Sequence, residues 1–141
     1  MKITFYPIEE MENEKYFAAV IVSRYRGKWI YVKHRERETW EIPGGRREPG
    51  ENIITTANRE LQEETGALDF TIYPLSAYGV KVAKKEETYG LLCYSEIDNI
   101  GELPEMEIEK IGLFDKEPEK LTYPDIQPIL FKKARELMSK E

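Results

Sequence analysis

Four glutamates, one arginine and two glycines stand at fixed offsets in one short segment. They are Gly45, Glu51, Arg59, Glu60, Glu63, Glu64 and Gly66. Like charges three and four residues apart on a helix repel one another by roughly a few tenths of a kcal/mol per pair, and Arg59 is the cation within that helix. Carboxylate and carbonyl oxygens are the ligands of hard cations such as Mg²⁺ and Mn²⁺, usually alongside substrate phosphates. The pattern therefore favours a divalent metal site that acts on a phosphate-bearing substrate.

The same segment predicts the turn and the helix that position these side chains. Pro and Gly cluster at 43–45 and again at 48–50, which indicates turns. From Asn52 to Thr65 the chain has no Gly or Pro, and Gly66 stands where a left-handed C-terminal cap is wanted. At about 100° per residue, an acidic face and an adjacent apolar face are expected. The acidic face has Glu60, Glu63 and Glu64, and the apolar face has Ile54, Ala57 and Leu61.

The whole chain has the size and composition of one soluble domain. It has 141 residues, a net charge of −6 and 40% hydrophobic residues. The acidic balance argues against duplex nucleic acid as a partner, which needs a basic face. No apolar run approaches the roughly 20 residues of a membrane span, and the N-terminus lacks the apolar stretch of a signal peptide. We therefore expect a cytoplasmic protein without a membrane partner, in which the lone Cys93 is a buried small hydrophobe.

Hydrophobic runs and turn signals predict a mixed sheet with two helices. Strands are expected near residues 3–6, 16–23, 29–34, 40–42, 68–82, 88–97 and 107–115. Pro74 is expected at a bulge or an edge. A closing amphipathic helix is expected at 125–139, with Pro128 in its first turn. Its expected apolar stripe is Ile126, Ile129, Leu130, Ala134 and Leu137. This order is typical of an α+β or layered α/β/α fold.

The acidic segment resembles the signature of the Nudix hydrolases. In that signature a glycine and a glutamate precede Arg-Glu, an aliphatic residue, Glu-Glu and a second glycine. The matching positions are Gly45, Glu51, Arg59, Glu60, Leu61, Glu63, Glu64 and Gly66, and Ala67 departs because the family has a bulkier aliphatic residue there. The resemblance implies a Nudix-type α/β/α sandwich with a mixed sheet, in which residues 1–141 form a single Nudix hydrolase domain.

The resemblance also implies roles for individual residues. Metal ligands are expected at Glu60, Glu63 and Glu64 and at the carbonyl of Gly45, with Mg²⁺ or Mn²⁺ as the cofactor. Arg59 would orient Glu60, and Glu51 would support the site through a salt bridge or a bridging water. The general base is Glu60 in this interpretation, although some relatives use a glutamate from a distant loop. The candidates for a further carboxylate are Glu87, or Glu86 beside it, and Glu105 or Glu107.

Substrate phosphates need cations outside the acidic helix. Arg35 stands where related enzymes place a phosphate-contacting arginine, and Arg46 and Arg47 lie within the signature. His34 is interpreted as a strand-end residue rather than a base. The aromatic residues that could stack on a base are Trp40, Tyr78 and Tyr123, with core packing as the alternative for each.

The expected reaction is hydrolysis of a pyrophosphate linkage. Similarity to small bacterial MutT-like members favours a (deoxy)nucleoside triphosphate, including oxidised guanine forms, as the substrate and monophosphate plus pyrophosphate as the products. The alternatives are an RNA 5′-triphosphate, ADP-ribose and a dinucleoside polyphosphate. A non-catalytic nucleotide-binding regulator is the alternative from another class. The sequence leaves open the base preference and the choice between a monomer and a homodimer.

Overall fold

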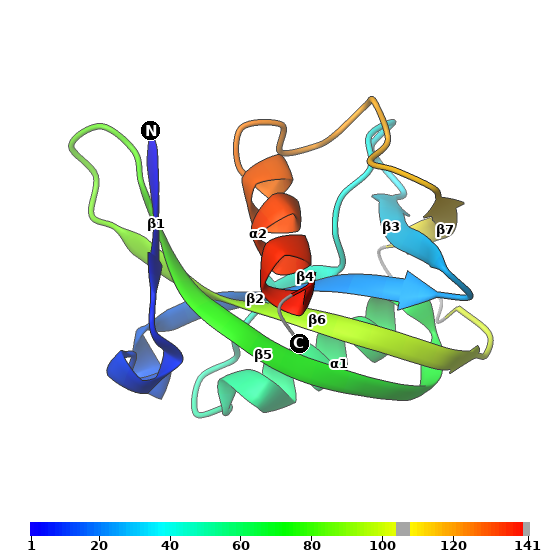
Figure 1. The fold of residues 1–141 in the computed structure, drawn as a ribbon, viewed down its shortest axis with the longest axis horizontal. Coiled ribbons are helices and arrows are strands. Elements are labelled where there is room, and N and C mark those ends of the chain that lie inside the picture. The colour runs from blue at the N-terminus through cyan, green and yellow to red at the C-terminus, as the bar shows by residue number, and fades with distance from the viewer. Residues whose placement is uncertain (104–107, 140–141) are drawn as a thin grey trace.

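A mixed β-sheet lies between two helices in the computed structural model, which describes residues 1–103 and 108–139 (Figure 1). The strands are β1 (Lys2–Tyr6), β2 (Tyr16–Tyr25), β3 (Lys28–His34), β4 (Gly44–Arg46), β5 (Ala67–Lys81), β6 (Thr88–Ile100) and β7 (Ile108–Phe114). The helices are α1 (Ile53–Thr65) and α2 (Gln127–Ser139), and short 3-10 turns span Ile8–Glu10 and Asn13–Lys15. Within the described part of the chain, no helix is long and apolar enough to span a membrane.

The sheet order creates a gap beside β2, and β4 fills it. The strands are ordered β1-β5-β6-β2-β3-β7, with β2 and β6 parallel. The far end of β2 pairs with β3 from Ser23 to Tyr25, whereas its near half pairs with β4 from Ala18 to Val20. The strand β4 therefore lies against the centre of the sheet, directly before the chain enters α1.

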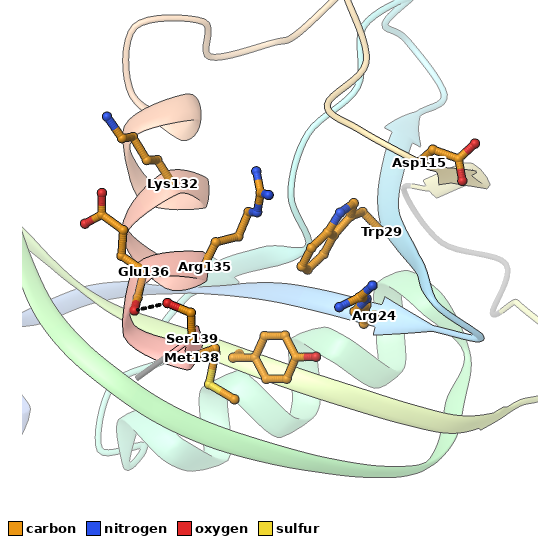
Figure 2. Close-up of a pocket in the computed structure, with 9 residues that line it drawn as sticks. Arg24, Trp29, Asp115, Lys132, Arg135, Glu136, Met138 and Ser139 are labelled. Atoms are coloured by element: carbon orange, nitrogen blue, oxygen red, sulfur yellow. Dashed lines mark hydrogen bonds between the residues drawn. The ribbon is translucent and has the colours of Figure 1, made fainter. Parts of the chain in front are cut away.

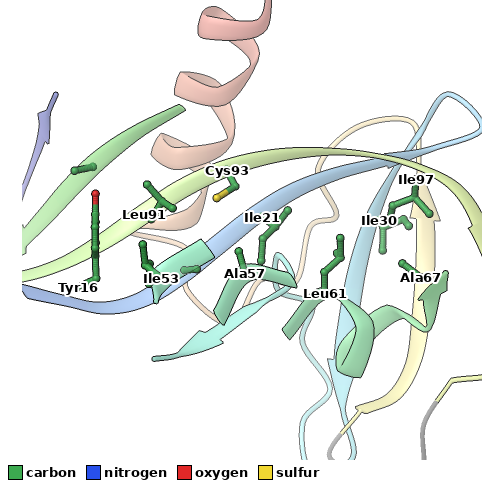
Figure 3. Packing of buried hydrophobic residues seen from close by; sticks show 12 residues of the cluster. Tyr16, Ile21, Ile30, Ile53, Ala57, Leu61, Ala67, Leu91, Cys93 and Ile97 are labelled. Carbon is green, nitrogen blue, oxygen red and sulfur yellow. The ribbon is translucent and has the colours of Figure 1, made fainter. Parts of the chain in front are cut away.

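Each face of the sheet is covered by one helix, and this confirms the α/β/α arrangement. The core beneath α1 includes Ile53, Ala57 and Leu61 of the helix together with alternate residues of β2 and β6 (Figure 3). The core beneath α2 includes Leu130, Phe131 and Ala134 together with the intervening residues of the same strands. Because side chains alternate across a strand, a continuous apolar run at the centre of β2 supplies both cores at once.

The Pro43-Gly44-Gly45 segment departs from the expectation. Its composition indicates a turn, but Gly44 and Gly45 begin the strand β4. A Cβ atom on Gly44 would overlap the carbonyl oxygen of Ala19. The missing side chain therefore allows β4 to approach β2 closely, which is a known use of glycine next to another backbone.

Candidate active site

The helix α1 is fixed at both ends by local capping. The Asn52 side chain accepts a hydrogen bond from the Ile54 N–H at 2.9 Å, and Asn13 accepts one from the Ile53 N–H at 2.8 Å. At the other end Gly66 adopts a left-handed conformation with φ of 75°, where a residue with a side chain would be strained. These caps fix where α1 begins and ends, and packing of its apolar face on the sheet leaves the acidic face against β4.

Arg59 forms hydrogen bonds with several groups on and around the acidic face. Its Nε and Nη2 atoms donate to the two carboxylate oxygens of Glu51 at 2.9 and 3.0 Å, which is a bidentate pair. Its Nη1 atom donates to Glu60 at 2.7 Å and to Glu63 at 3.4 Å, and Nη2 also donates to the carbonyl of Arg46 at 3.0 Å. One guanidinium thus contacts three carboxylates and ties α1 to the end of β4.

The same contacts change the acidity of Glu51. Hydrogen bonds from Arg59 come first, followed by the Thr56 hydroxyl and the Glu48 backbone N–H, and together they lower the pKa of Glu51 to about 2. The pKa of Arg59 is raised, chiefly by its hydrogen bonds to Glu51. Both shifts favour the charged pair over the neutral one.

The Glu51 shift predicts a specific loss of stability in acid. Because its pKa is lower in the folded protein than the ordinary value of 4.5, ionised Glu51 stabilises the fold above pH 4.5, and this stabilisation disappears as the pH falls toward 2. We expect Glu51→Gln to be less stable than the parent at pH 7 and nearly as stable at pH 2, as measured by urea unfolding. The control is Glu48→Gln, because Glu48 is mostly exposed and lies 3.8 Å from Arg59. An equal gap between Glu51→Gln and the parent at both pH values would contradict the prediction.

Two glycines bring β4 into contact with the glutamates of α1. The Gly44 N–H donates to the Glu64 carboxylate at 2.9 Å, and Glu64 is buried. A Cβ atom on Gly45 would overlap the carboxylate atoms of Glu60. Of the glutamates predicted as metal ligands, Glu60 therefore lies directly against Gly45, which is predicted to share that role, and Glu64 lies against the neighbouring Gly44.

The sequence did not point to Glu41, and it indicated only a strand-end position for His34. The Nε2 atom of His34, at the end of β3, lies 2.8 Å from Glu41 and 3.6 Å from Glu64. Glu41 is buried and also forms a 2.9 Å ion pair with Arg37. The backbones of Val32 and Glu41 pair as an isolated bridge, which holds Glu41 beside His34. The alternation of apolar and polar residues in Trp40-Glu41-Ile42 was the available sequence signal, but it does not show which side chain Glu41 contacts.

A cavity of about 330 Å³ opens beside this cluster. It is lined by His34, Arg35, Glu36 and Arg37. Arg35 is exposed at this cavity, within the loop that follows β3. Of the arginines predicted to contact phosphates, Arg35 is therefore the one that lines a cavity near the acidic helix.

The other two predicted arginines have partners elsewhere. The Arg46 guanidinium lies over the Phe17 ring, 4.9 Å from its centroid. Arg47 donates to the backbone carbonyls of Tyr16, Glu48, Glu51 and Glu14, at 2.9 to 3.5 Å. These bonds hold the loop before α1 against the start of β2. These contacts support a loop-anchoring role for Arg47, and its contact with substrate stays a prediction.

Replacing Arg47 is expected to affect stability more than substrate binding. Hydrogen bonds from a charged donor contribute up to about 3 kcal/mol, and part of this loop is exposed, so Arg47→Ala should lower the unfolding free energy by roughly 1 to 3 kcal/mol. Arg46→Ala is the matched control, because an exposed cation–π contact contributes roughly 0.5 to 1 kcal/mol. Urea unfolding measures both changes. Unchanged stability together with a raised KM would instead indicate that Arg47 contacts the substrate.

Glu87, the first candidate for a further carboxylate, does not lie beside the acidic helix. Glu87 lies at the β5–β6 hairpin, where it accepts hydrogen bonds from Tyr6 at 2.7 Å and Tyr89 at 3.2 Å. Its side chain covers Gly79, where a Cβ atom would overlap the carboxylate. These contacts assign Glu87 to the hairpin rather than to a metal site, and Glu86 lies in the same exposed turn. Glu105 and Glu107 lie outside the described residues.

The three aromatic residues that could stack on a base lie in different environments. Tyr78 is buried in the core beneath α2, and Trp40 packs on Phe114 with the ring centroids 5.1 Å apart. Tyr123 is 41% exposed and lies beneath the guanidinium of Arg37, a residue that lines the 330 Å³ cavity. Of the three, Tyr123 is the one whose ring remains accessible to a substrate.

The carboxylate oxygens of the acidic face are suitable ligands for a hard cation, but several of them already accept hydrogen bonds from Arg59. In the ranges that the structure describes, no three His, Cys, Asp or Glu side chains converge closely enough to hold an ion. Glu60 and Glu63 instead contact Arg59. Cation binding therefore competes with Arg59 for these carboxylates.

Comparisons with known proteins agree with the fold and the motif. The family model described as the NUDIX domain matches residues 13–128. A Bacillus subtilis protein with the provisional name 8-oxo-dGTP diphosphatase YtkD is 31% identical over 103 residues, which cover 72% of this chain and 64% of that protein. The mouse 8-oxo-dGDP phosphatase NUDT18 is 32% identical over 66 residues, 45% of this chain and 20% of that protein. The chain thus spans less than two thirds of the length of either relative.

Solved structures show the same fold at lower identity. The Bacillus subtilis pyrophosphohydrolase BsRppH, solved as a mutant, superposes with a TM-score of 0.77 at 24% identity, covering 95% of this chain and 90% of that one. A UDP-X diphosphatase superposes with a TM-score of 0.69 at 17% identity, covering 92% of this chain and 66% of that one.

Proposed function

Because the chain belongs to the NUDIX domain family, we propose that it is a metal-dependent hydrolase of a pyrophosphate linkage in a nucleotide. The proposed substrate is a (deoxy)nucleoside triphosphate, oxidised guanine forms included, and the products are the monophosphate and pyrophosphate. The names of the Bacillus and mouse relatives support this class of substrate. The observation that carries the proposal is the acidic face of α1, held by Arg59 against β4 and next to a cavity lined by Arg35.

Divalent ions are the cofactors that this family generally uses, and we propose Mg²⁺ or Mn²⁺ here. The proposed ligands are the carboxylates of Glu60, Glu63 and Glu64 with the carbonyl of Gly45. The contact between Gly45 and Glu60 supports this set, because a Cβ atom at Gly45 would occupy the space that the carboxylate uses. When bound, such ions polarise phosphoryl oxygens, lower the pKa of a water molecule and screen phosphate charge.

The protein's own residues divide the remaining tasks. Glu60 is the proposed general base that removes a proton from the attacking water, and Arg59 orients it through the 2.7 Å hydrogen bond. Glu51 fixes the opposite side of the Arg59 guanidinium. Arg35, at the cavity, is proposed to contact the substrate phosphates with its planar fork of donors.

His34 and Glu41 are proposed to position Glu64. The His34 ring lies between the two carboxylates, and the Gly44 N–H holds the second oxygen of Glu64. Because both glutamates are buried, their orientation depends on these few partners. This arrangement connects the loop after β3 directly to the acidic face of α1.

A substrate panel tests the proposed reaction. Nucleoside triphosphates, 8-oxo-dGTP, ADP-ribose, dinucleoside polyphosphates and 5′-triphosphate RNA should be incubated with Mg²⁺ or Mn²⁺, and the products separated by chromatography. Pyrophosphate released from a triphosphate supports the proposal. Preferred cleavage of ADP-ribose or of RNA would change the substrate but keep the reaction. Nucleotide binding without turnover of any substrate would favour the non-catalytic regulator.

Gly45 gives a prediction that separates activity from stability. In Gly45→Ala the new Cβ would displace the Glu60 carboxylate, and because a small misplacement of a catalytic group costs roughly 10²-fold, we expect kcat to fall by about that factor. Stability should change little, because the displaced atoms end a flexible side chain. In Gly44→Ala the Cβ would instead meet the backbone of Ala19, so that variant should lose stability. Thermal unfolding and initial rates measure the two effects, and wild-type kcat in a folded Gly45→Ala would contradict the prediction.

A further inference from the structure

A second and larger cavity lies on the opposite face of the sheet, beneath the C-terminal half of α2. Its volume is about 740 Å³, within the range of small-molecule sites. The residues that matter for its chemistry are Arg24, Trp29, Tyr94, Arg135 and Met138 (Figure 2). Trp29 and His34 lie near opposite ends of β3, and at the usual rise per residue of a β-strand they are roughly 17 Å apart. This cavity is therefore separate from the candidate active site.

Two arginines on different walls of the cavity are each held on an aromatic ring. The Arg24 guanidinium lies 4.7 Å from the centroid of Trp29, and the Arg135 guanidinium lies 5.5 Å from the centroid of Phe131. Trp29 and Phe131 also contact each other edge to face at 4.9 Å. Stacking restricts both side chains in advance, so less conformational entropy is lost when they bind a ligand.

Arg24 retains hydrogen-bonding capacity. Its Nη2 atom makes a long, 3.4 Å bond to the carbonyl of Gly27. Its Nε atom is buried and has no hydrogen-bond partner in the part of the chain that the structure describes. A ligand does not reach this Nε atom in the present conformation, so an oxyanion in the cavity would accept hydrogen bonds from the terminal nitrogens of Arg24, of which Nη2 makes the long bond to Gly27.

The charges around the cavity favour an anion. Arg24, Arg135 and Lys132 line it together with two acids, Asp115 and Glu136. Asp115 is already paired with Lys28 at 2.6 Å. Figure 2 shows Arg135 and Trp29 extending toward each other, whereas Lys132 and Glu136 point away. Two acids outside the lining offset part of this charge, because Glu117 interacts electrostatically with Arg135 and Glu96 accepts a hydrogen bond from the Tyr94 hydroxyl. Within the lining itself, three cations face two acids.

We propose that this cavity binds a nucleoside monophosphate without a metal ion, with its phosphate between Arg24 and Arg135. Inorganic phosphate alone would leave most of the volume unfilled, whereas Trp29 and Met138, both partly exposed in the lining, offer an apolar surface for a planar base. The inference rests on the second cavity alone and does not depend on the hydrolysis proposed above.

Calorimetric titration with GMP in the presence of EDTA tests the proposal. We expect GMP to bind more tightly than guanosine, which lacks the phosphate, and than ribose 5-phosphate or inorganic phosphate, which lack the base. Arg24→Gln and Arg135→Gln should each weaken GMP binding about 10-fold or more, the range for a hydrogen bond between charged groups. Arg135 is exposed on α2, so its replacement should leave the fold intact.

Two further variants locate the binding site. Arg26→Gln removes the same charge from the neighbouring turn, where Arg26 stacks on Tyr25 outside the cavity, and should bind GMP like the parent. Arg35→Gln alters the other cavity and should also leave metal-free GMP binding unchanged. Absence of GMP binding at millimolar concentration, or binding that is lost in Arg35→Gln and retained in Arg24→Gln, would overturn the proposal.

Discussion

Turnover is expected to fall to background when divalent ions are stripped from the protein, and to return when Mg²⁺ or Mn²⁺ is added back. The acidic face of α1 has Glu60, Glu63 and Glu64, of which Glu60 lies against Gly45 and Glu64 against Gly44, and their carboxylates are a donor set of hard oxygens. Substrate phosphates add more negative charge to the same place, so without cations the substrate and the site repel each other. The measurement is a rate assay on protein treated with chelator, dialysed, and then titrated with each ion.

The fold should survive this treatment, and this outcome separates a catalytic role of the metal from a structural one. Arg59 already neutralises carboxylates of α1 through hydrogen bonds at 2.7 to 3.4 Å. We therefore expect the far-ultraviolet circular dichroism spectrum to be the same before and after metal removal. Full turnover after exhaustive removal would contradict the assignment of the metal site. Unfolding on removal would mean that Arg59 does not stabilise the metal-free state.

Local features made α1 predictable from the sequence. Asn52 and Gly66 cap the helix as their side-chain chemistry and conformational freedom predict, and the residues between them are helix formers. The acidic residues are three or four positions apart, so their common face follows from helix geometry alone. The closing helix and the strand bulge at Pro74 are confirmed for similar local reasons.

Features set by packing were harder to predict. The expected apolar stripe of α1 included Ile54, which is 38% exposed, whereas its neighbour Ile53 is buried. In α2 the expected stripe included Ile129, which is 45% exposed, and omitted the buried Phe131. The centre of each apolar face is as expected, and the errors lie at its edges, where contacts with strands distant in sequence decide which residues are covered.

The site shows the same division between local and distant contacts. An ion pair between Arg59 and Glu63 follows from their four-residue spacing on a helix and is present at 3.4 Å, whereas the contact of Arg59 with Glu60 was implied only by the family resemblance and is also present, at 2.7 Å. Arg47 donates to the carbonyls of Tyr16 and Glu14, 31 and 33 residues away, and Glu87 accepts from Tyr6, 81 residues away, so these contacts were not visible in the local sequence. The link from Glu41 through His34 to Glu64 likewise depends on three separate segments. A one-dimensional pattern can identify the chemistry of a residue without identifying its partner.

Glu60→Gln is expected to lower kcat by at least roughly 10²-fold to 10⁴-fold, the range for loss of a general base, and by more if Glu60 also binds metal. Gln has nearly the same shape and still accepts a hydrogen bond from Arg59, but its amide is not basic and is a weaker cation ligand. The variant should therefore fold normally and retain the contact with the backbone of Gly45. Initial rates at saturating substrate and metal measure the effect.

Glu48→Gln is the matched control, because Glu48 lies near Arg59 and is mostly exposed. Its kcat should equal that of the parent, which shows that removing one negative charge near Arg59 does not by itself stop the reaction. Raising the metal concentration separates the two roles of Glu60. Recovery of activity at high metal would indicate lost metal binding, and a persistent deficit would indicate a lost base. Near-normal turnover in Glu60→Gln, together with a severe loss in a loop variant such as Glu86→Gln or Glu87→Gln, would place the base in the β5–β6 hairpin and refute the role of Glu60.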